Sequence, residues 1–228
     1  MKRQYLIVTA ALLISLVSGC ASYYYVPVEN EQVMVIAERG LSIAVIEEES
    51  MRINAQAGDE KEHIRFRVEI KNNSDAIISI NENCATIRQG TAPGNMIEAK
   101  KTYTASEFLE KESDSAATMA CCLCMGAVAS SASAARDGTV SSRLNEHIAY
   151  ENLDKELEES ASYLVFLRNN LLFTSDILPG KKYRGLVYGD LWKNGFDSGV
   201  KTDSTMISIT LRINEKEYVF LFSRNKVN

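Results

Sequence analysis

The residues best suited to carry chemistry lie together in one short segment, residues 119–125 (MACCLCM). Thiolate and thioether sulfur are soft ligands that suit Cu(I). On a helix Cys121 and Cys124 share a face, but Cys122 points about 100° away, so one metal ion would require a distorted helix or a loop. Cysteine is also a good small buried hydrophobic residue. We therefore expect packing cysteines with no metal or cofactor, and keep as the alternative a copper site made of Met119, Cys121, Cys122, Cys124 and Met125.

A disulfide is a further interpretation of the same cysteines. Cys84 lies in the preceding strand-rich part of the chain. An oxidising compartment would allow it to pair with a cysteine of the cluster. Four cysteines leave several pairings open, so the partner of Cys84 is one of Cys121, Cys122 and Cys124.

The other polar residues do not form a recognisable catalytic pattern, so we expect a protein that is not an enzyme. The two histidines, His63 and His147, lie outside any HExxH or Cys/His ligand spacing. We expect both to be surface or capping residues. No serine lies in a GxSxG or SxxK pattern, and no nucleotide-binding glycine motif is present. Asp190, Trp192 and Asp197 could line a sugar site, but a loop at the rim of a sandwich is the simpler interpretation.

The first twenty residues indicate where the protein is located. Lys2 and Arg3 form a basic start, and the apolar run over residues 5–17 has the length of a signal-peptide core. The run closes on Val17-Ser18-Gly19-Cys20, which resembles the lipobox of bacterial lipoproteins. This resemblance implies that Cys20 is lipidated and becomes the new N-terminus after cleavage. An ordinary signal peptide or an uncleaved anchor is the alternative.

The residues after Cys20 indicate which membrane would hold the lipid anchor. In Gram-negative lipoproteins an Asp directly after the cysteine commonly marks retention in the inner membrane, whereas here Ala21-Ser22 follow Cys20. For a Gram-negative host the resemblance therefore implies a lipid anchor in the outer membrane, with the protein facing the periplasm.

The charge of the chain excludes one class of partner. The signal segment holds two of the 25 basic residues and none of the 30 acidic ones, so the formal charge changes from −5 to −7 on cleavage. A nucleic-acid-binding surface is basic. We therefore expect no nucleic-acid partner.

Strand patterns occupy both ends of the mature chain. The clearest covers 63–71, where Ile64, Phe66, Val68 and Ile70 alternate with charged residues. Residues 205–213 alternate in the same way, and a turn at 214–216 leads into a last strand at 218–223. We expect Phe66, Val68, Ile209 and Leu211 to face the core.

The middle of the chain has a helical pattern. Thr104 and Glu107 have the spacing of a capping box, in which each side chain accepts a hydrogen bond from the other's backbone N–H. Residues 116–135 are small and uncharged, and Asp137-Gly138 interrupts them. Because this helix is too poor in large apolar residues for a confident membrane span, we expect it to pack on the next helix. The residues of that helix expected in the contact are Tyr150, Leu153, Leu157, Ala161 and Leu164.

These patterns predict a mainly β fold, an antiparallel β-sandwich interrupted by an α-helical hairpin. The strand and turn over 66–74, the Pro-Gly turn at 179–180 and the last hairpin resemble immunoglobulin-like domains of bacterial envelope lipoproteins. The expected organisation is a signal peptide at 1–19, a lipidated tether at 20–31, a sandwich at 32–102 and 171–228, and a helical insertion at 103–170.

The expected function is that of a lipid-anchored envelope scaffold or binding module. The lipid would anchor the protein in the membrane, and residues 103–170 would bind a protein partner or a second copy of the chain. A soft-metal protein that uses the cysteine and methionine cluster for copper is the alternative function.

Overall fold

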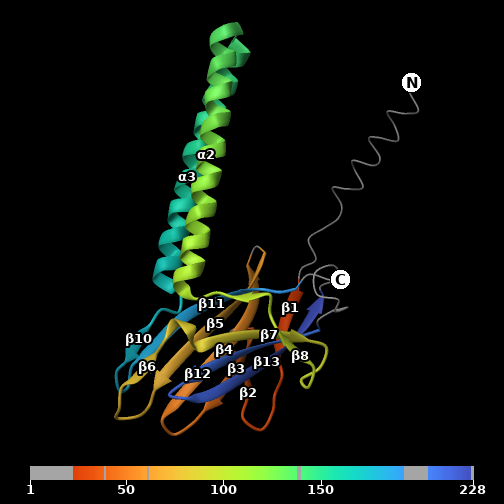
Figure 1. Cartoon of the computed structure of the whole chain (residues 1–228), viewed down its shortest axis with the longest axis vertical. Coiled ribbons are helices and arrows are strands. Elements are labelled where there is room, and N and C mark those ends of the chain that lie inside the picture. Colours follow the sequence, from red (N-terminus) through yellow and green to blue (C-terminus); the bar gives the residue numbers. More distant parts are fainter. Residues whose placement is uncertain (1–22, 39, 61, 138–139, 193–204, 227–228) are drawn as a thin grey trace, which may run out of the picture.

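Two antiparallel β-sheets pack on each other and form the body of the molecule (Figure 1). The computed structural model describes residues 23–38, 40–60, 62–137, 140–192 and 205–226, with the backbone alone at 126–127, 129–137 and 140–146. The lipobox and Asp197 therefore lie outside the described residues. One sheet has the order β1-β13-β12-β7-β8, with bounds Tyr23–Pro27, Lys216–Lys226, Met206–Ile213, Ala85–Gly90 and Met96–Glu98.

The second sheet has the order β2-β3-β4-β5-β11-β9, with bounds Met34–Glu38, Leu41–Glu47, Met51–Glu60, His63–Asn72, Lys182–Asp190 and Lys101–Thr102. A short pair, β6 (Ile78–Ile80) and β10 (Ser175–Ile177), and a 3₁₀ turn η1 (Glu82–Cys84) complete the β part. This architecture confirms the predicted β-sandwich with a helical insertion. Its immunoglobulin-like type stays a prediction.

The core between the sheets follows from the alternation in the strands. Phe66 and Val68 of β5 and Ile209 and Leu211 of β12 are fully buried, which confirms the predicted inward faces. The rings of Phe66 and Phe222 meet across the sandwich with their centroids 5.6 Å apart. The core therefore joins the strands before the helical insertion to those that follow it.

The last hairpin is closed by a tight turn. Asn214 and Glu215 have φ values of 50° and 65°, and Ile213 pairs with Lys216. Two successive residues with positive φ make the turn that matches the twist of a two-residue β-hairpin. The predicted turn between the last two strands is confirmed.

The expected tether at 20–31 is wrong for residues 23–27, which form β1 and pair with β13. The aromatic and β-branched residues of this segment favour a strand. The guanidinium of Arg224 lies 3.8 Å from the centre of the Tyr23 ring, and the Tyr25 hydroxyl donates a hydrogen bond to Asp59. Strand β1 therefore begins three residues after Cys20.

Two long helices form an antiparallel hairpin that projects from one end of the sandwich (Figure 1). Helix α2 spans Ala105–Asp137 and α3 spans Val140–Asn170. The predicted capping box is confirmed, because the Thr104 N–H donates to Glu107 over 3.0 Å and the Glu107 N–H donates to Thr104 over 3.1 Å. At 1.5 Å per residue each helix is about 46 Å long or more. Both lie within the segment 103–170 expected to be the insertion.

Candidate functional site

The foot of the hairpin is fixed on the sandwich by a small aromatic cluster. Phe108 of α2 and Leu167 of α3 are fully buried against the outer face of the second sheet. Phe108 stacks on Tyr188 of β11, with ring centroids 4.0 Å apart and planes 5° from parallel. Burying such side chains stabilises the attachment by about 1.5–3 kcal/mol each. The foot of the hairpin therefore packs on the sandwich, whereas the rest of the hairpin projects away from it as an arm.

A partly buried polar cluster lies beside these rings. His63 at the start of β5 is 7% exposed, and its Nδ1 lies 2.5 Å from Asp190 Oδ1 at the end of β11. The Lys111 ammonium of α2 lies 3.1 Å from His63 Nε2. Both contacts are satisfied when Nδ1 carries the proton and donates to Asp190 while Nε2 accepts from Lys111. The expectation that His63 is a surface or capping residue is wrong.

Tyr103 completes this cluster. Its hydroxyl donates to Asp190 Oδ2 over 2.6 Å and accepts from the Lys111 ammonium over 3.1 Å. Burial by itself would raise the pKa of Asp190, but the hydrogen bonds from Tyr103 and His63, with Lys111 nearby, hold that pKa below its ordinary value. The carboxylate is thus the acceptor that joins β5, β11 and α2.

The second helix is tied to the same end of the sandwich. The Tyr163 hydroxyl of α3 donates to Glu60 Oε1 over 3.1 Å, and Glu60 also forms an ion pair with Arg65. Burial, with the Glu60 carboxylate adjacent, raises the pKa of Tyr163. Both helices are therefore held by polar contacts as well as by the aromatic cluster.

Beyond the foot, α2 has two faces. The face with Phe108, Glu112, Ala116, Ala120 and Leu123 is buried or half-buried, since α3 packs along α2. The opposite face carries Cys121, Cys124, Met125 and Val128, spaced i, i+3, i+4, i+7. Met125 is 62% exposed and Val128 is 64% exposed. We call these four residues the outer face of α2.

The expectation that the cysteines pack inside the protein is wrong, because Cys121, Cys122 and Cys124 are all exposed. Alanines fill the side toward α3, so the thiols face away from it. The expected α3 contact is only partly right. Leu153 is buried and Leu164 is half-buried, whereas Tyr150, Leu157 and Ala161 are exposed.

The predicted disulfide is not formed, because Cys84 is buried and free and the three helix cysteines are free. Glu82 of η1 accepts hydrogen bonds from Ser106, which places this turn at the start of α2. Cys121 lies fifteen residues further along the helix, or about 22 Å at 1.5 Å per residue. Disulfide-linked Cα atoms lie about 4.4–6.8 Å apart. Cys84 is thus on the sandwich, far from its predicted partners.

The structure does not gather the predicted copper ligands. Among the described residues, no three His, Cys, Asp or Glu side chains come together as a group that could hold a metal ion. Cys121 and Cys124 share the outer face of α2, whereas Cys122 points elsewhere, as its spacing requires. The copper hypothesis stays a prediction.

The other sequence candidates have structural places. Trp192 donates its ring N–H to the Glu98 carbonyl over 3.0 Å, and its backbone N–H to Gln89 over 2.7 Å. It therefore belongs to the rim of the first sheet, as the simpler interpretation held. His147 is exposed on α3, where its Nε2 lies 3.2 Å from Glu151, and its surface position is confirmed.

Within the part of the chain that the structure describes, neither helix is long and apolar enough to cross a membrane.

No protein-family model, curated protein or solved structure matches this chain.

Proposed function

We propose that this chain is a lipid-anchored protein of the cell envelope that binds a protein partner, or a second copy of itself, through the outer face of α2. The observation that carries the proposal is the contrast along the hairpin. The foot of the hairpin is buried by aromatic residues, whereas Met125 and Val128, about two thirds of the way along α2, are each more than 60% exposed. Exposed apolar side chains grouped on a projecting element are typical of an interaction site.

The spacing of the outer face supports a helical partner. Residues at i, i+3, i+4 and i+7 form one stripe that another helix can pack against. Cysteine is small and methionine is flexible, so the stripe allows a close and adaptable approach. No charged residue interrupts it between Cys121 and Val128.

The path of β1 supports a location near the membrane. The Tyr25 hydroxyl bonds to Asp59, and the next residue, Glu60, bonds to Tyr163 at the foot of the hairpin. A lipid on Cys20 would be joined to Tyr23, the first residue of β1, by no more than about 10 Å of chain. The arm would then leave the sandwich at its anchored end.

The composition of α3 opposes immersion of the arm in lipid. The stretch 151–159 carries six exposed ionisable residues, Glu151, Asp154, Lys155, Glu156, Glu158 and Glu159. Such residues are costly inside a bilayer. The partner is therefore expected to be another envelope protein or a second copy, bound beside the membrane.

The experiment compares assembly of two variants of the detergent-extracted full chain. Met125→Asp with Val128→Asp places charge on the outer face, and Leu178→Asp places it on an apolar residue of the sandwich that is 52% exposed. We expect crosslinking and light scattering to show an assembly that the double variant loses and Leu178→Asp keeps. Unchanged assembly in the double variant would contradict the proposal.

A further inference from the structure

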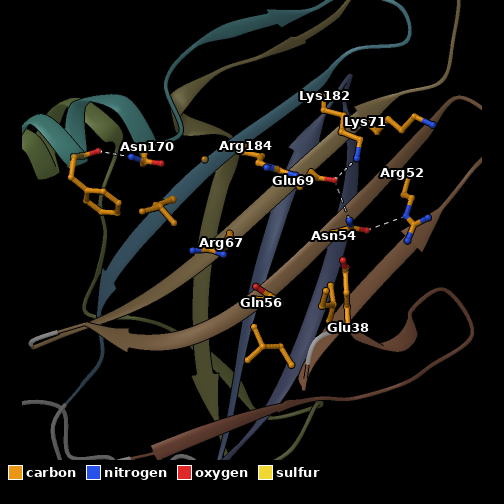
Figure 2. A pocket seen from close by; sticks show the side chains of 15 residues that line it. Glu38, Arg52, Asn54, Gln56, Arg67, Glu69, Lys71, Asn170, Lys182 and Arg184 are labelled. Atoms are coloured by element: carbon orange, nitrogen blue, oxygen red, sulfur yellow. Dashed lines mark hydrogen bonds and ion pairs between the residues drawn. The ribbon is translucent and has the colours of Figure 1, made fainter.

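The outer face of the second sheet is hollowed below the foot of the hairpin (Figure 2). The hollow has a volume of about 690 Å³ and is lined by residues of β2, β3, β4, β5, β11 and the end of α3. It lies on the opposite side of this sheet from the core. Its residues belong neither to the outer face of α2 nor to the polar cluster around His63.

A row of three basic residues crosses the hollow. Lys71 of β5 is the register partner of Arg52 on β4 and of Lys182 on β11, so the three side chains lie side by side on one face. Like charges directly opposite each other destabilise a sheet. This row of like charges therefore lowers the stability of the sheet, and such unfavourable arrangements are expected at functional sites.

The described residues neutralise this row only in part. Glu69 binds Lys182 over 3.2 Å and also forms an ion pair with Arg184. Although burial alone would raise it, these cations lower the pKa of Glu69, so the carboxylate stays charged. Lys71 and Arg67 form no ion pair with any described residue, and Glu47, in register with Arg52, forms none either.

The sign of the hollow is opposite to that of the chain. Its lining contains five basic residues and two acidic ones, whereas the whole chain has a formal charge of −5. Figure 2 shows the basic side chains of three neighbouring strands on one surface, with Glu69 among them. This surface is therefore complementary to an anion.

One wall of the hollow is apolar. Phe166, at the end of α3, is 41% exposed, and Leu186 of β11 also lines the hollow. A ligand that is only an inorganic ion would leave this wall unused. The combination of a cationic row and an apolar wall suits a molecule with a compact anionic group and an organic part.

We propose that this hollow binds the phosphate or diphosphate group of an organic molecule. Neighbouring strands lie about 4.8 Å apart, so the row Arg52, Lys71 and Lys182 spans about 10 Å. Within that span a diphosphate presents several negative charges, whereas a carboxylate presents one. Arginine and lysine bind phosphate oxygens through charge-assisted hydrogen bonds. The phosphate can belong to a soluble molecule or to a lipid headgroup.

The test is calorimetric titration of the full chain in detergent with inorganic pyrophosphate and with dihexanoylphosphatidate. Dihexanoylphosphatidylcholine is the control ligand for the lipid probe, and sodium sulfate is the control ligand for pyrophosphate. We expect Arg52→Gln with Lys71→Gln to weaken phosphate binding at least about tenfold, while the exposed Lys100→Gln leaves it unchanged. Tighter binding of pyrophosphate identifies a soluble ligand, and tighter binding of the short-chain lipid identifies a headgroup.

Three results would overturn the proposal. They are binding of neither phosphate probe, equal binding by the double variant, and binding of a polyglutamate peptide in preference to pyrophosphate. The double variant removes a repulsion together with the hydrogen bond from Arg52 Nε to Asn54, so its thermal melting is measured beside that of Lys71→Gln alone. Weaker phosphate binding by the single variant, which keeps that hydrogen bond, would not reflect lost folding.

Discussion

His63 and Asp190 are 127 positions apart in the sequence, yet their side chains lie 2.5 Å apart beneath the helical hairpin. The first begins β5 and the second ends β11, two strands that pair through the middle of the second sheet. Because Lys111 and Tyr103 meet the same two side chains, this contact links the sheet to the start of α2. The contact therefore helps to attach the foot of the hairpin to the sheet.

We predict that Asp190→Ala loosens the foot of the hairpin. The change leaves the Tyr103 hydroxyl and the His63 ring without their acceptor, which costs about 1–3 kcal/mol of unfolding free energy. Urea denaturation measures the loss, and hydrogen exchange of residues 103–112 locates it. Asp154→Ala, at an exposed position of α3, is the control. Equal stability of the two variants would refute the role of the cluster.

The same carboxylate predicts a dependence on acid. Its pKa is held below the ordinary value of 3.8. A group whose pKa is lower in the folded state stabilises that state above its unfolded pKa, and the stabilisation is lost as pH falls through the folded pKa. We expect the native chain to lose stability below about pH 4 more steeply than Asp190→Asn. Parallel acid limbs for the two proteins would contradict this assignment.

The alternation of β5 gives a prediction for the core. Phe66 is fully buried between the sheets, so Phe66→Ala is expected to cost about 3–5 kcal/mol. Arg67 is exposed on the other face of the strand, and Arg67→Ala is expected to stay within about 0.5 kcal/mol. Thermal melting compares the two, and similar losses would mean that the faces are wrongly assigned.

The basic row gives a prediction of opposite sign. Lys71→Gln removes a charge that lies between Arg52 and Lys182. In the absence of phosphate we expect a gain of about 0.2–1 kcal/mol, measured by urea denaturation at low salt, against Lys100→Gln as the reference. A loss of stability would show that Lys71 has a structural partner and not a ligand to bind.

Strand faces and the helix start were predictable from the sequence because each rests on local spacing. Phe66 and Val68 follow a period of two, and Thr104 and Glu107 satisfy each other within one turn. The burial of His63 is different in kind. His63 lies on the outer face of β5 together with Arg65 and Arg67. Its side chain is buried because the start of α2 packs over that end of the strand.

The cysteine segment could not be oriented from its composition. Two stripes run along α2 with helical spacing, one with Ala116, Ala120 and Leu123 and the other with Cys121, Cys124, Met125 and Val128. Either could face α3 by periodicity alone. The structure packs the smaller residues inward, which allows the helices to approach closely and leaves the larger sulfur side chains outside. Likewise, the strand character of Tyr23-Tyr24-Tyr25 depends on a pairing with β13, about two hundred residues away.

The most direct test of the arm is photocrosslinking in intact cell envelopes. A benzoylphenylalanine at position 128 probes the outer face of α2, and the same group at position 154 probes an exposed position of α3. We predict a discrete crosslinked species from position 128, to a second copy or to another envelope protein, and none from position 154. The absence of any specific crosslink at position 128, with the protein present in the envelope, would contradict a binding role for the hairpin.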